Sequence, residues 1–214
     1  MRRPRVVSEV RKPVLELMPP SATRPHPWLS PDAVRRYDAT CADRGTFDVY
    51  LTSLAERKML EQSTRAAPKR LEVMGLLLGE VRSWKGVTYT IVRDVGTTDL
   101  KNSPAKVKFD PEAMPKLFAD LDSVGFDYVV VGWYHSHPGH TCFLSRTDMR
   151  TQKAMFSQSF HCAIVIDPVN MEIEAFKMRG EGYIGVPFAL VDGGFPRLRR
   201  LRASQGEHSS QSGR

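Results

Sequence analysis

Two histidines and an aspartate lie close together in residues 132–152, GWYHSHPGHTCFLSRTDMRTQ. Side chains alternate between the two faces of a strand, so His135 and His137 are expected to point to the same side. Asp148, in the first turn of a following helix, can then present its carboxylate beside the two imidazoles. Two nitrogen ligands and one oxygen ligand, with a fourth position open to water, are typical of a catalytic rather than a structural zinc site. The spacing therefore predicts that these three residues bind Zn2+.

Two neighbouring positions have more than one interpretation. Ser145 and Asp148 match a helix capping box, in which Ser145 accepts from the amide of Asp148 and the carboxylate reaches back. With the histidines present, we favour Asp148 as a ligand and Ser145 as a catalytic hydroxyl turned towards the site, and the two roles are compatible. Cys142 lies in the same loop, but a cysteine nucleophile needs a histidine base that is free of metal. We therefore expect Cys142 to pack and support the loop.

The run HSHP followed by SRTD resembles the signature of the JAMM (MPN+) metalloproteases, which reads His-x-His, seven residues, then Ser-x-x-Asp. Upstream, residues 71–80, LEVMGLLLGE, are similar to the stretch that precedes this site in the deubiquitinating subunit of the proteasome lid and the deneddylating subunit of the signalosome. The resemblance covers about residues 46–180 and places Glu72 at the family's general-base position. Without it, Glu72 would be interpreted as an exposed acid at the start of a strand.

The resemblance implies an α/β (α+β) fold of the MPN type, with a mixed, largely antiparallel β-sheet flanked by helices and a cytidine-deaminase-like layering. It implies a zinc isopeptidase that hydrolyses the amide bond between the C-terminus of ubiquitin or a ubiquitin-like modifier and a substrate lysine, and that also processes the modifier precursor. The implied partners are the modifier and its conjugates, together with the proteasome or another MPN subunit. Two alternatives stay open: a JAMM hydrolase of another peptide or small-molecule amide, and a non-catalytic MPN scaffold.

Residues 97–109 occupy the place where similar enzymes order a segment over the tail of the modifier. The resemblance therefore implies that Lys101, Lys106 and Phe109 bind substrate. Lys108 adds a further positive charge to this loop. An arginine-rich ubiquitin tail would be repelled there, which favours a less basic modifier unless the lysines point away.

The elements that must position the site are expected in the order βαββαβαββ. Residues 73–81 and 87–95 read as paired strands joined by a Ser-Trp-Lys-Gly turn. A capping-box pattern at Ser53 begins a helix that ends before Pro68. The other expected elements are a strand at 47–51, a helix from Asp110 to about 123, a buried strand at 127–137, a helix at 146–157, and strands at 161–167 and 171–178.

The chain has 214 residues, enough for one well-filled core with tails. We expect a proline-rich basic N-terminal extension at 1–45 without regular structure, an MPN/JAMM catalytic domain at 46–180, and a C-terminal segment at 181–214 with a flexible basic tail. The net charge of +7 resides in the ends, since residues 1–40 carry eight Lys and Arg against four Asp and Glu, and residues 191–214 carry five against two. The balanced middle argues against a dedicated nucleic-acid surface.

Cysteine usage and hydropathy indicate the compartment. The three cysteines form no C-x-x-C pair, which fits a reducing environment. No run approaches the roughly 18 apolar residues that a membrane helix needs, and no apolar segment follows the basic N-terminus. These features predict a cytoplasmic protein that does not contact a membrane.

Overall fold

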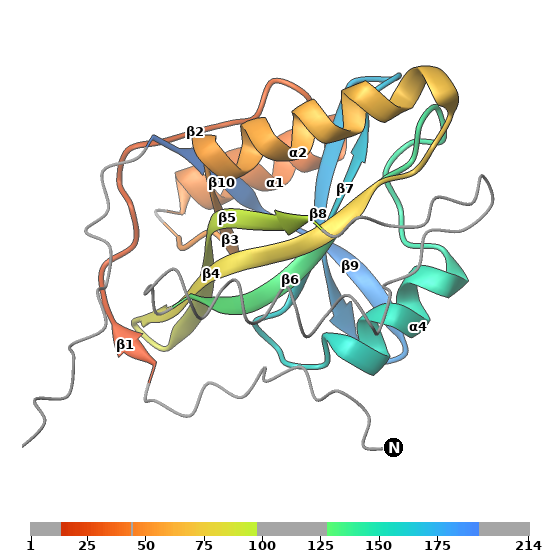
Figure 1. Ribbon diagram of the computed structural model, residues 1–214. Helices are drawn as coiled ribbons and strands as arrows, with labels where there is room; N and C mark the ends of the chain where they lie inside the picture. The colour runs from red at the N-terminus through yellow and green to blue at the C-terminus, as the bar shows by residue number, and fades with distance from the viewer. Residues whose placement is uncertain (1–13, 44, 98–127, 193–214) are drawn as a thin grey trace, which may run out of the picture.

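The computed structural model describes residues 14–43, 45–97 and 128–192. In this part of the chain, ten strands form one sheet in the order β2-β10-β3-β5-β4-β6-β7-β8-β9, and β1 pairs with β4 (Figure 1). The strands are β1 (Leu15–Glu16), β2 (Thr23–Arg24), β3 (Val49–Thr52), β4 (Met74–Trp84), β5 (Val87–Thr97), β6 (Val129–Ser136), β7 (Cys162–Asp167), β8 (Glu172–Arg179), β9 (Gly182–Val186) and β10 (Phe188–Val191). The helices are α1 (Pro31–Ala42), α2 (Ser53–Ala66) and α4 (Arg146–Met155), with a short 3-10 turn at Ala67–Lys69.

The sheet is mixed, with antiparallel pairing in the majority. Strand β4 pairs antiparallel with β5 and β6, β8 pairs antiparallel with β7 and β9, and β2 pairs antiparallel with β10. The parallel pairs are β1/β4, β3/β10, β3/β5 and β6/β7. The expected mixed, largely antiparallel sheet is therefore confirmed.

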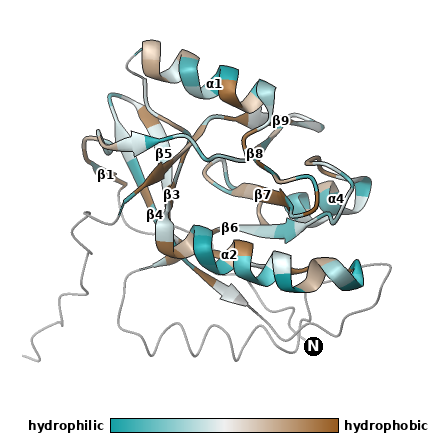
Figure 2. Cartoon of the chain, turned by 90° about the horizontal axis from the view of Figure 1, so that it is seen from above, coloured by the Kyte–Doolittle hydropathy of each residue, from teal (hydrophilic) through white to brown (hydrophobic). Residues whose placement is uncertain are grey.

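Helices α2 and α4 cover opposite faces of the central strands. Leu77 of β4 packs in one buried cluster with Ala55 and Met59 of α2, whereas its neighbours Leu76 and Leu78 belong to a second cluster. Met149 and Met155 of α4 pack against that second cluster. Since successive strand side chains point to opposite faces, the two clusters lie on the two sides of the sheet. Figure 2 shows hydrophobic and hydrophilic residues interleaved along α2, as expected for a helix with one face on a sheet.

Most predicted elements agree with the structure to within a few residues, but the start of α2 was predicted one residue too late. The N-cap is Thr52, whose Oγ1 accepts from the backbone N–H of Ala55 at 3.4 Å. Thr52 is the last residue of β3 and keeps extended backbone angles, so the first helical residue is Ser53. The Ser53 hydroxyl instead donates to the Asp192 carboxylate at 2.7 Å.

Five elements lie where no regular structure was expected. Two of them are the short strands β1 and β2, which fall in residues 1–45. Helix α1 falls in the proline-rich residues 1–45, where Ser30 caps it and Pro31 occupies its first position. Strands β9 and β10 fall in the glycine- and proline-rich residues after 180. All four residues of β10 are buried, and β10 pairs in parallel with β3. The division of the chain into three segments at 45 and 180 stays a prediction.

The expected helix from Asp110 and the loop at 97–109 lie largely or wholly outside the described residues, as do most of the two basic ends. Within residues 14–43, 45–97 and 128–192, no helix is both long enough and apolar enough to cross a membrane.

Candidate metal centre

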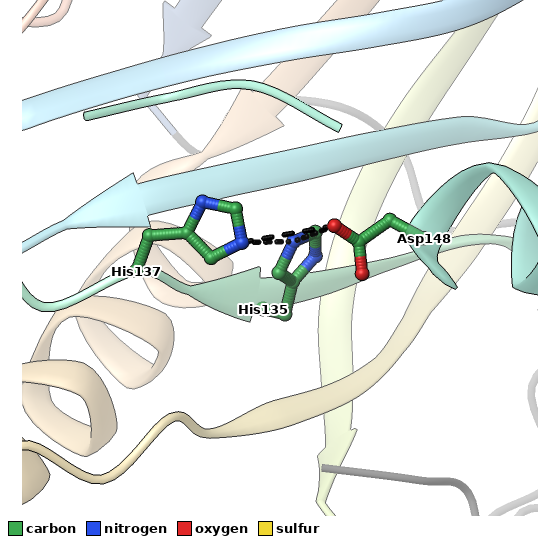
Figure 3. Close-up of side chains that lie close together, drawn as sticks. All are labelled: His135, His137 and Asp148. Carbon is green, nitrogen blue, oxygen red and sulfur yellow. Dashed lines mark hydrogen bonds and ion pairs between the residues drawn. The ribbon is translucent and has the colours of Figure 1, made fainter. Parts of the chain in front are cut away.

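The structure brings His135, His137 and Asp148 together at the end of β6 (Figure 3). His135 is the next-to-last residue of β6, and His137 continues the pairing with β7 because its N–H donates to the Ile166 carbonyl at 2.9 Å. Asp148 lies in the first turn of α4 and points its carboxylate at the two rings. Both histidines are buried and Asp148 is partly buried. The three predicted ligands therefore converge from two separate elements.

The distances within this cluster fit a zinc ion. The two histidine Nε2 atoms are 3.1 Å apart, and Asp148 Oδ2 lies 3.5 Å from Nε2 of His135 and 3.7 Å from Nε2 of His137. Tetrahedral bonds of about 2.0–2.1 Å place neighbouring ligand atoms roughly 3.3 Å apart. Two nitrogens and one oxygen at this separation suit Zn2+ and leave one position that these residues do not fill.

The surroundings favour the protonation states that bind a cation. Burial, the largest influence, lowers the pKa of His135, although the Asp148 carboxylate acts in the opposite direction. Burial alone would raise the pKa of Asp148, but contacts with His135, His137 and Ser145 hold it far below its usual range. A neutral imidazole and an ionised carboxylate are the forms that coordinate metal.

A bulge in β6 sets the direction in which His135 points. The pairing of β4 with β6 shifts between Leu77 and Leu78, so Val131 is an extra residue opposite β4. The shift occurs next to Gly132, which has φ +153°. Beyond the bulge, Trp133 joins the α4 side of the sheet and Met74 pairs with His135. An extra residue moves every side chain that follows it in the strand to the opposite face of the sheet. This bulge therefore places His135 on the face of the sheet that α4 covers.

Gly132→Ala is expected to destabilise the fold and disturb the metal centre. A Cβ at Gly132 would lie 1.9 Å from the Cys162 carbonyl oxygen, which is backbone of the paired strand β7 and cannot rotate away. We expect a loss of at least ~1–3 kcal/mol in the free energy of unfolding, measured by urea titration. Gly182→Ala is the matched control, because its nearest contact would be 4.0 Å away. Equal losses in the two variants would contradict this role of Gly132.

Trp133 and Gln152 orient His135, and neither was predicted to do so. The Trp133 ring stacks on the His135 ring with centroids 4.5 Å apart and planes 13° apart. The Trp133 Nε1–H donates to Gln152 Oε1 at 2.6 Å, and Gln152 Nε2 donates to the Phe156 carbonyl at 3.0 Å. Gln152 is itself buried on α4. The imidazole plane is thus fixed by a chain of contacts that begins on the helix carrying Asp148.

Ser145 and Asp148 form the capping box that the spacing indicated. Ser145 Oγ accepts from the Asp148 N–H at 3.2 Å, and Asp148 Oδ2 accepts from the Ser145 N–H at 2.7 Å. The same Oδ2 atom faces the two histidines. Accepting one hydrogen bond leaves the Ser145 hydroxyl proton available to a ligand in the site. The capping geometry is therefore compatible with a further role for Ser145.

Glu72 lies beside the cluster but outside its three ligand atoms. It precedes β4 by two residues and is partly buried. The adjoining backbone is fixed, since Val73 N–H donates to Ser136 Oγ at 3.0 Å and Ser136 N–H donates to the Val73 carbonyl at 2.9 Å. Because Met74 is opposite His135 in this antiparallel pair, Glu72 continues the register opposite His137 and on the same face. The catalytic role of Glu72 stays a prediction.

Two other polar residues are occupied by structural contacts. The Cys142 Sγ–H donates to the Val165 carbonyl at 3.3 Å, and burial raises the pKa of the thiol well above its usual range. This agrees with the expected packing role. His161 Nδ1 accepts from the Gln158 N–H at 3.1 Å, and burial lowers the pKa of His161 to about 4. Lys101, Lys106 and Phe109, the expected substrate-binding residues, lie outside the described residues.

Two relatives of known sequence are similar to about two thirds of this chain. The chain is 38% identical over 148 residues to the 26S proteasome non-ATPase regulatory subunit 14 of Dictyostelium discoideum, covering 65% of this chain and 46% of that protein. It is 38% identical over 154 residues to the ubiquitin carboxyl-terminal hydrolase RPN11 of Saccharomyces cerevisiae, covering 66% and 48%. The chain thus spans about half the length of these relatives.

A solved structure shares the fold, and a family profile matches the part of the chain that contains the candidate site. The solution structure of protein DSY2949 from Desulfitobacterium hafniense has a TM-score of 0.52 at 22% sequence identity, covering 67% of this chain and 93% of that one. This likeness concerns the fold alone. Residues 45–158, which are more than half of the chain, match the family described as JAB1/Mov34/MPN/PAD-1 ubiquitin protease. This range contains the five residues on which the resemblance rests: Glu72, His135, His137, Ser145 and Asp148. The chain therefore belongs to the JAB1/Mov34/MPN/PAD-1 family.

Proposed function

We propose that the protein is a zinc-dependent isopeptidase that hydrolyses the amide bond between the C-terminus of ubiquitin or a ubiquitin-like modifier and a substrate lysine. The observation that carries the proposal is the convergence of His135, His137 and Asp148 on one point, with their ligand atoms within 4.8 Å of one another. Family membership supports the reaction class, and one relative is named a ubiquitin carboxyl-terminal hydrolase. Processing of a modifier precursor breaks the same kind of bond.

Each residue of the proposed site would have a distinct role in the hydrolysis. His135, His137 and Asp148 would hold zinc, which in such sites lowers the pKa of a bound water from about 15.7 to about 7 and polarises a carbonyl oxygen. Glu72 would accept a proton from the attacking water and deliver it to the lysine amine as the C–N bond breaks. The Ser145 hydroxyl would donate to the oxygen that becomes negative as water adds to the carbonyl carbon. The products are a free modifier carboxylate and a free lysine.

The partners and the location follow from the same resemblance. Relatives are named as 26S proteasome regulatory subunits, so we include the proteasome or another MPN subunit among the proposed partners. A cytoplasmic location is proposed with them. Binding to nucleic acid is not part of the proposal, because residues 41–190 carry as many acidic as basic side chains.

A substrate panel tests the function. Zinc-loaded protein is incubated with a ubiquitin dimer joined through lysine, with a ubiquitin-like modifier fused to a peptide, and with a short peptide amide that lacks a modifier. We expect cleavage of a modifier conjugate, loss of cleavage after treatment with a chelator, and recovery when Zn2+ but not Mg2+ is added back. Circular dichroism of the chelated sample checks that the fold survives. Cleavage of the short amide alone would support a different amide hydrolase, and cleavage of none by zinc-loaded protein would contradict the proposal.

A further inference from the structure

Asp167 is a buried carboxylate that accepts hydrogen bonds from two loops. It is the last residue of β7 and has 0% exposure. Oδ1 accepts from the N–H groups of Gly139 (2.9 Å), Val169 (2.9 Å) and Asn170 (3.1 Å), while Oδ2 accepts from the Thr141 N–H (2.7 Å) and from Asn170 Nδ2 (2.7 Å). Burial raises the pKa of Asp167, but the four backbone N–H groups outweigh this and hold it below its usual value. The carboxylate thus joins the β7–β8 turn to the loop that follows His137.

The loop is held in a conformation that its sequence does not favour. Thr141 has φ +63°, in the left-handed region that a β-branched residue rarely adopts. Such a conformation persists only where surrounding contacts impose it. Within the described structure, the bonds from Gly139 and Thr141 to Asp167 are contacts of this kind, one to each carboxylate oxygen. Thr141 is otherwise exposed.

The carbonyl of the same Thr141 contacts a metal ligand. His137 Nδ1 lies 3.3 Å from the Thr141 carbonyl oxygen. A carbonyl oxygen only accepts, so this contact requires the proton on Nδ1 and leaves a lone pair on Nε2. Nε2 is the atom that faces His135 and Asp148. Thr141 therefore links the two residues: its N–H donates to Asp167, and its carbonyl accepts from His137.

We infer that Asp167 is a positioning residue of the metal centre, which fixes the tautomer and direction of His137 by holding Thr141 in its left-handed conformation. The inference rests on the proposed zinc function, since it is the binding of zinc that needs His137 Nε2 unprotonated. Groups that orient a metal-binding histidine typically contribute 10–100-fold to metal affinity or activity. We expect a loss of about this size when Asp167 is changed.

A merely structural role for Asp167 predicts a different result. Three of its five hydrogen bonds come from Val169 and Asn170 and close the β7–β8 turn. If these alone mattered, changing Asp167 would lower the melting temperature without altering the zinc affinity of the folded protein. Zinc affinity and the absorption spectrum of bound Co2+ are therefore the informative measurements, because both respond to ligand geometry and neither needs a substrate.

The experiment compares four variants. In Asp167→Asn, one carboxylate oxygen becomes an NH2 group that must face a backbone N–H, either at Thr141 or at Gly139, so one loop contact is lost. Thr141→Pro removes the N–H that Asp167 accepts and cannot adopt a positive φ, whereas Thr141→Gly keeps the N–H, the carbonyl and the conformation. Asp48→Asn is the matched control, because it removes the negative charge from one carboxylate contact, to Lys177 at 2.9 Å, just before β3.

Chelator competition on the folded proteins measures the zinc affinity. We expect Asp167→Asn and Thr141→Pro to bind zinc about 10–100-fold more weakly than wild type and to give altered Co2+ spectra. Thr141→Gly and Asp48→Asn are expected to match wild type. Zinc affinity and a Co2+ spectrum equal to those of wild type, in either Asp167→Asn or Thr141→Pro, would overturn the inference. If Asp167→Asn does not fold, the result for Thr141→Pro alone tests the inference. A wild-type protein that binds zinc but cleaves no conjugate would overturn the proposed function and leave this inference standing.

Discussion

Glu72→Gln is expected to abolish cleavage of modifier conjugates while zinc remains bound. Glutamine has nearly the shape of glutamate but cannot accept a proton at neutral pH, so the variant removes the general base and little else. Loss of a general acid–base group typically lowers the rate by about a hundredfold to ten-thousandfold. The measurement is kcat for a lysine-linked ubiquitin conjugate, together with zinc per chain determined by mass spectrometry of the native protein.

The position of Glu72 explains why zinc should remain. Its backbone is held by the Val73–Ser136 pair of hydrogen bonds, and its side chain is not one of the three clustered ligands. Glu61→Gln is the matched control, since Glu61 is exposed on α2 and pairs with Arg65 one turn away. Cleavage at the wild-type rate by Glu72→Gln would remove Glu72 from the mechanism. Loss of zinc together with activity would instead make Glu72 a contributor to metal binding.

Ser145→Ala and Ser145→Gly are both expected to lose about a hundredfold to a thousandfold in kcat. That range is typical for removing one hydrogen-bond donor to a developing oxyanion, and both variants lack the hydroxyl. Their stabilities should differ, because Ala at an N-cap costs about 0.5–2 kcal/mol whereas Gly costs only a few tenths. Steady-state kinetics and urea unfolding of the two variants separate the catalytic role from the capping role.

A second capped helix supplies the control for Ser145. Ser30 caps α1 by accepting from the Ala33 N–H at 3.2 Å, and α1 carries none of the proposed site residues. Ser30→Ala should therefore lose stability in the same range with unchanged kcat. If both Ser145 variants cleave at the wild-type rate, Ser145 is a cap and nothing more.

The convergence of His135, His137 and Asp148 was predictable because much of their arrangement is local. Alternation along the end of β6 and the residue that follows it puts His135 and His137 on one side, and the Ser145–Asp148 capping box brings the carboxylate to the start of α4. Both patterns depend on spacings of two or three residues. The position of Glu72 is different, because it depends on the pairing of β4 with β6, and Val73 and Ser136 are 63 residues apart. Only the resemblance to a known family indicated it.

The residues that orient the ligands left no comparable signal. Asp167 precedes Pro168 and Asn170, and this run reads as an ordinary hairpin turn between β7 and β8. Its contacts to Gly139 and Thr141 join segments 28 and 26 residues apart in the sequence. Gln152 likewise reads as a polar helical residue until the fold buries it against Trp133. Long-range contacts of this kind are decided by tertiary packing and not by local pattern.

The missed elements divide into two kinds. Helix α1 had a local signal, because Ser30 followed by Pro31 is a common helix start, but the surrounding prolines favoured an irregular interpretation. Strand β10 had none, since these four residues in a glycine- and proline-rich segment become a strand by pairing with β3, where Phe188 is opposite Val49, and with β2. The buried positions of β10 show that tertiary pairing can outweigh weak local propensity.

Anomalous diffraction at the zinc absorption edge, from crystals of the zinc-loaded protein, tests the central claim most directly. The account predicts one peak bonded to Nε2 of His135, Nε2 of His137 and a carboxylate oxygen of Asp148, with Zn–N distances of about 2.0–2.1 Å and no fourth protein ligand. A zinc ion that binds elsewhere, or one whose fourth ligand is the sulfur of Cys142, would contradict it.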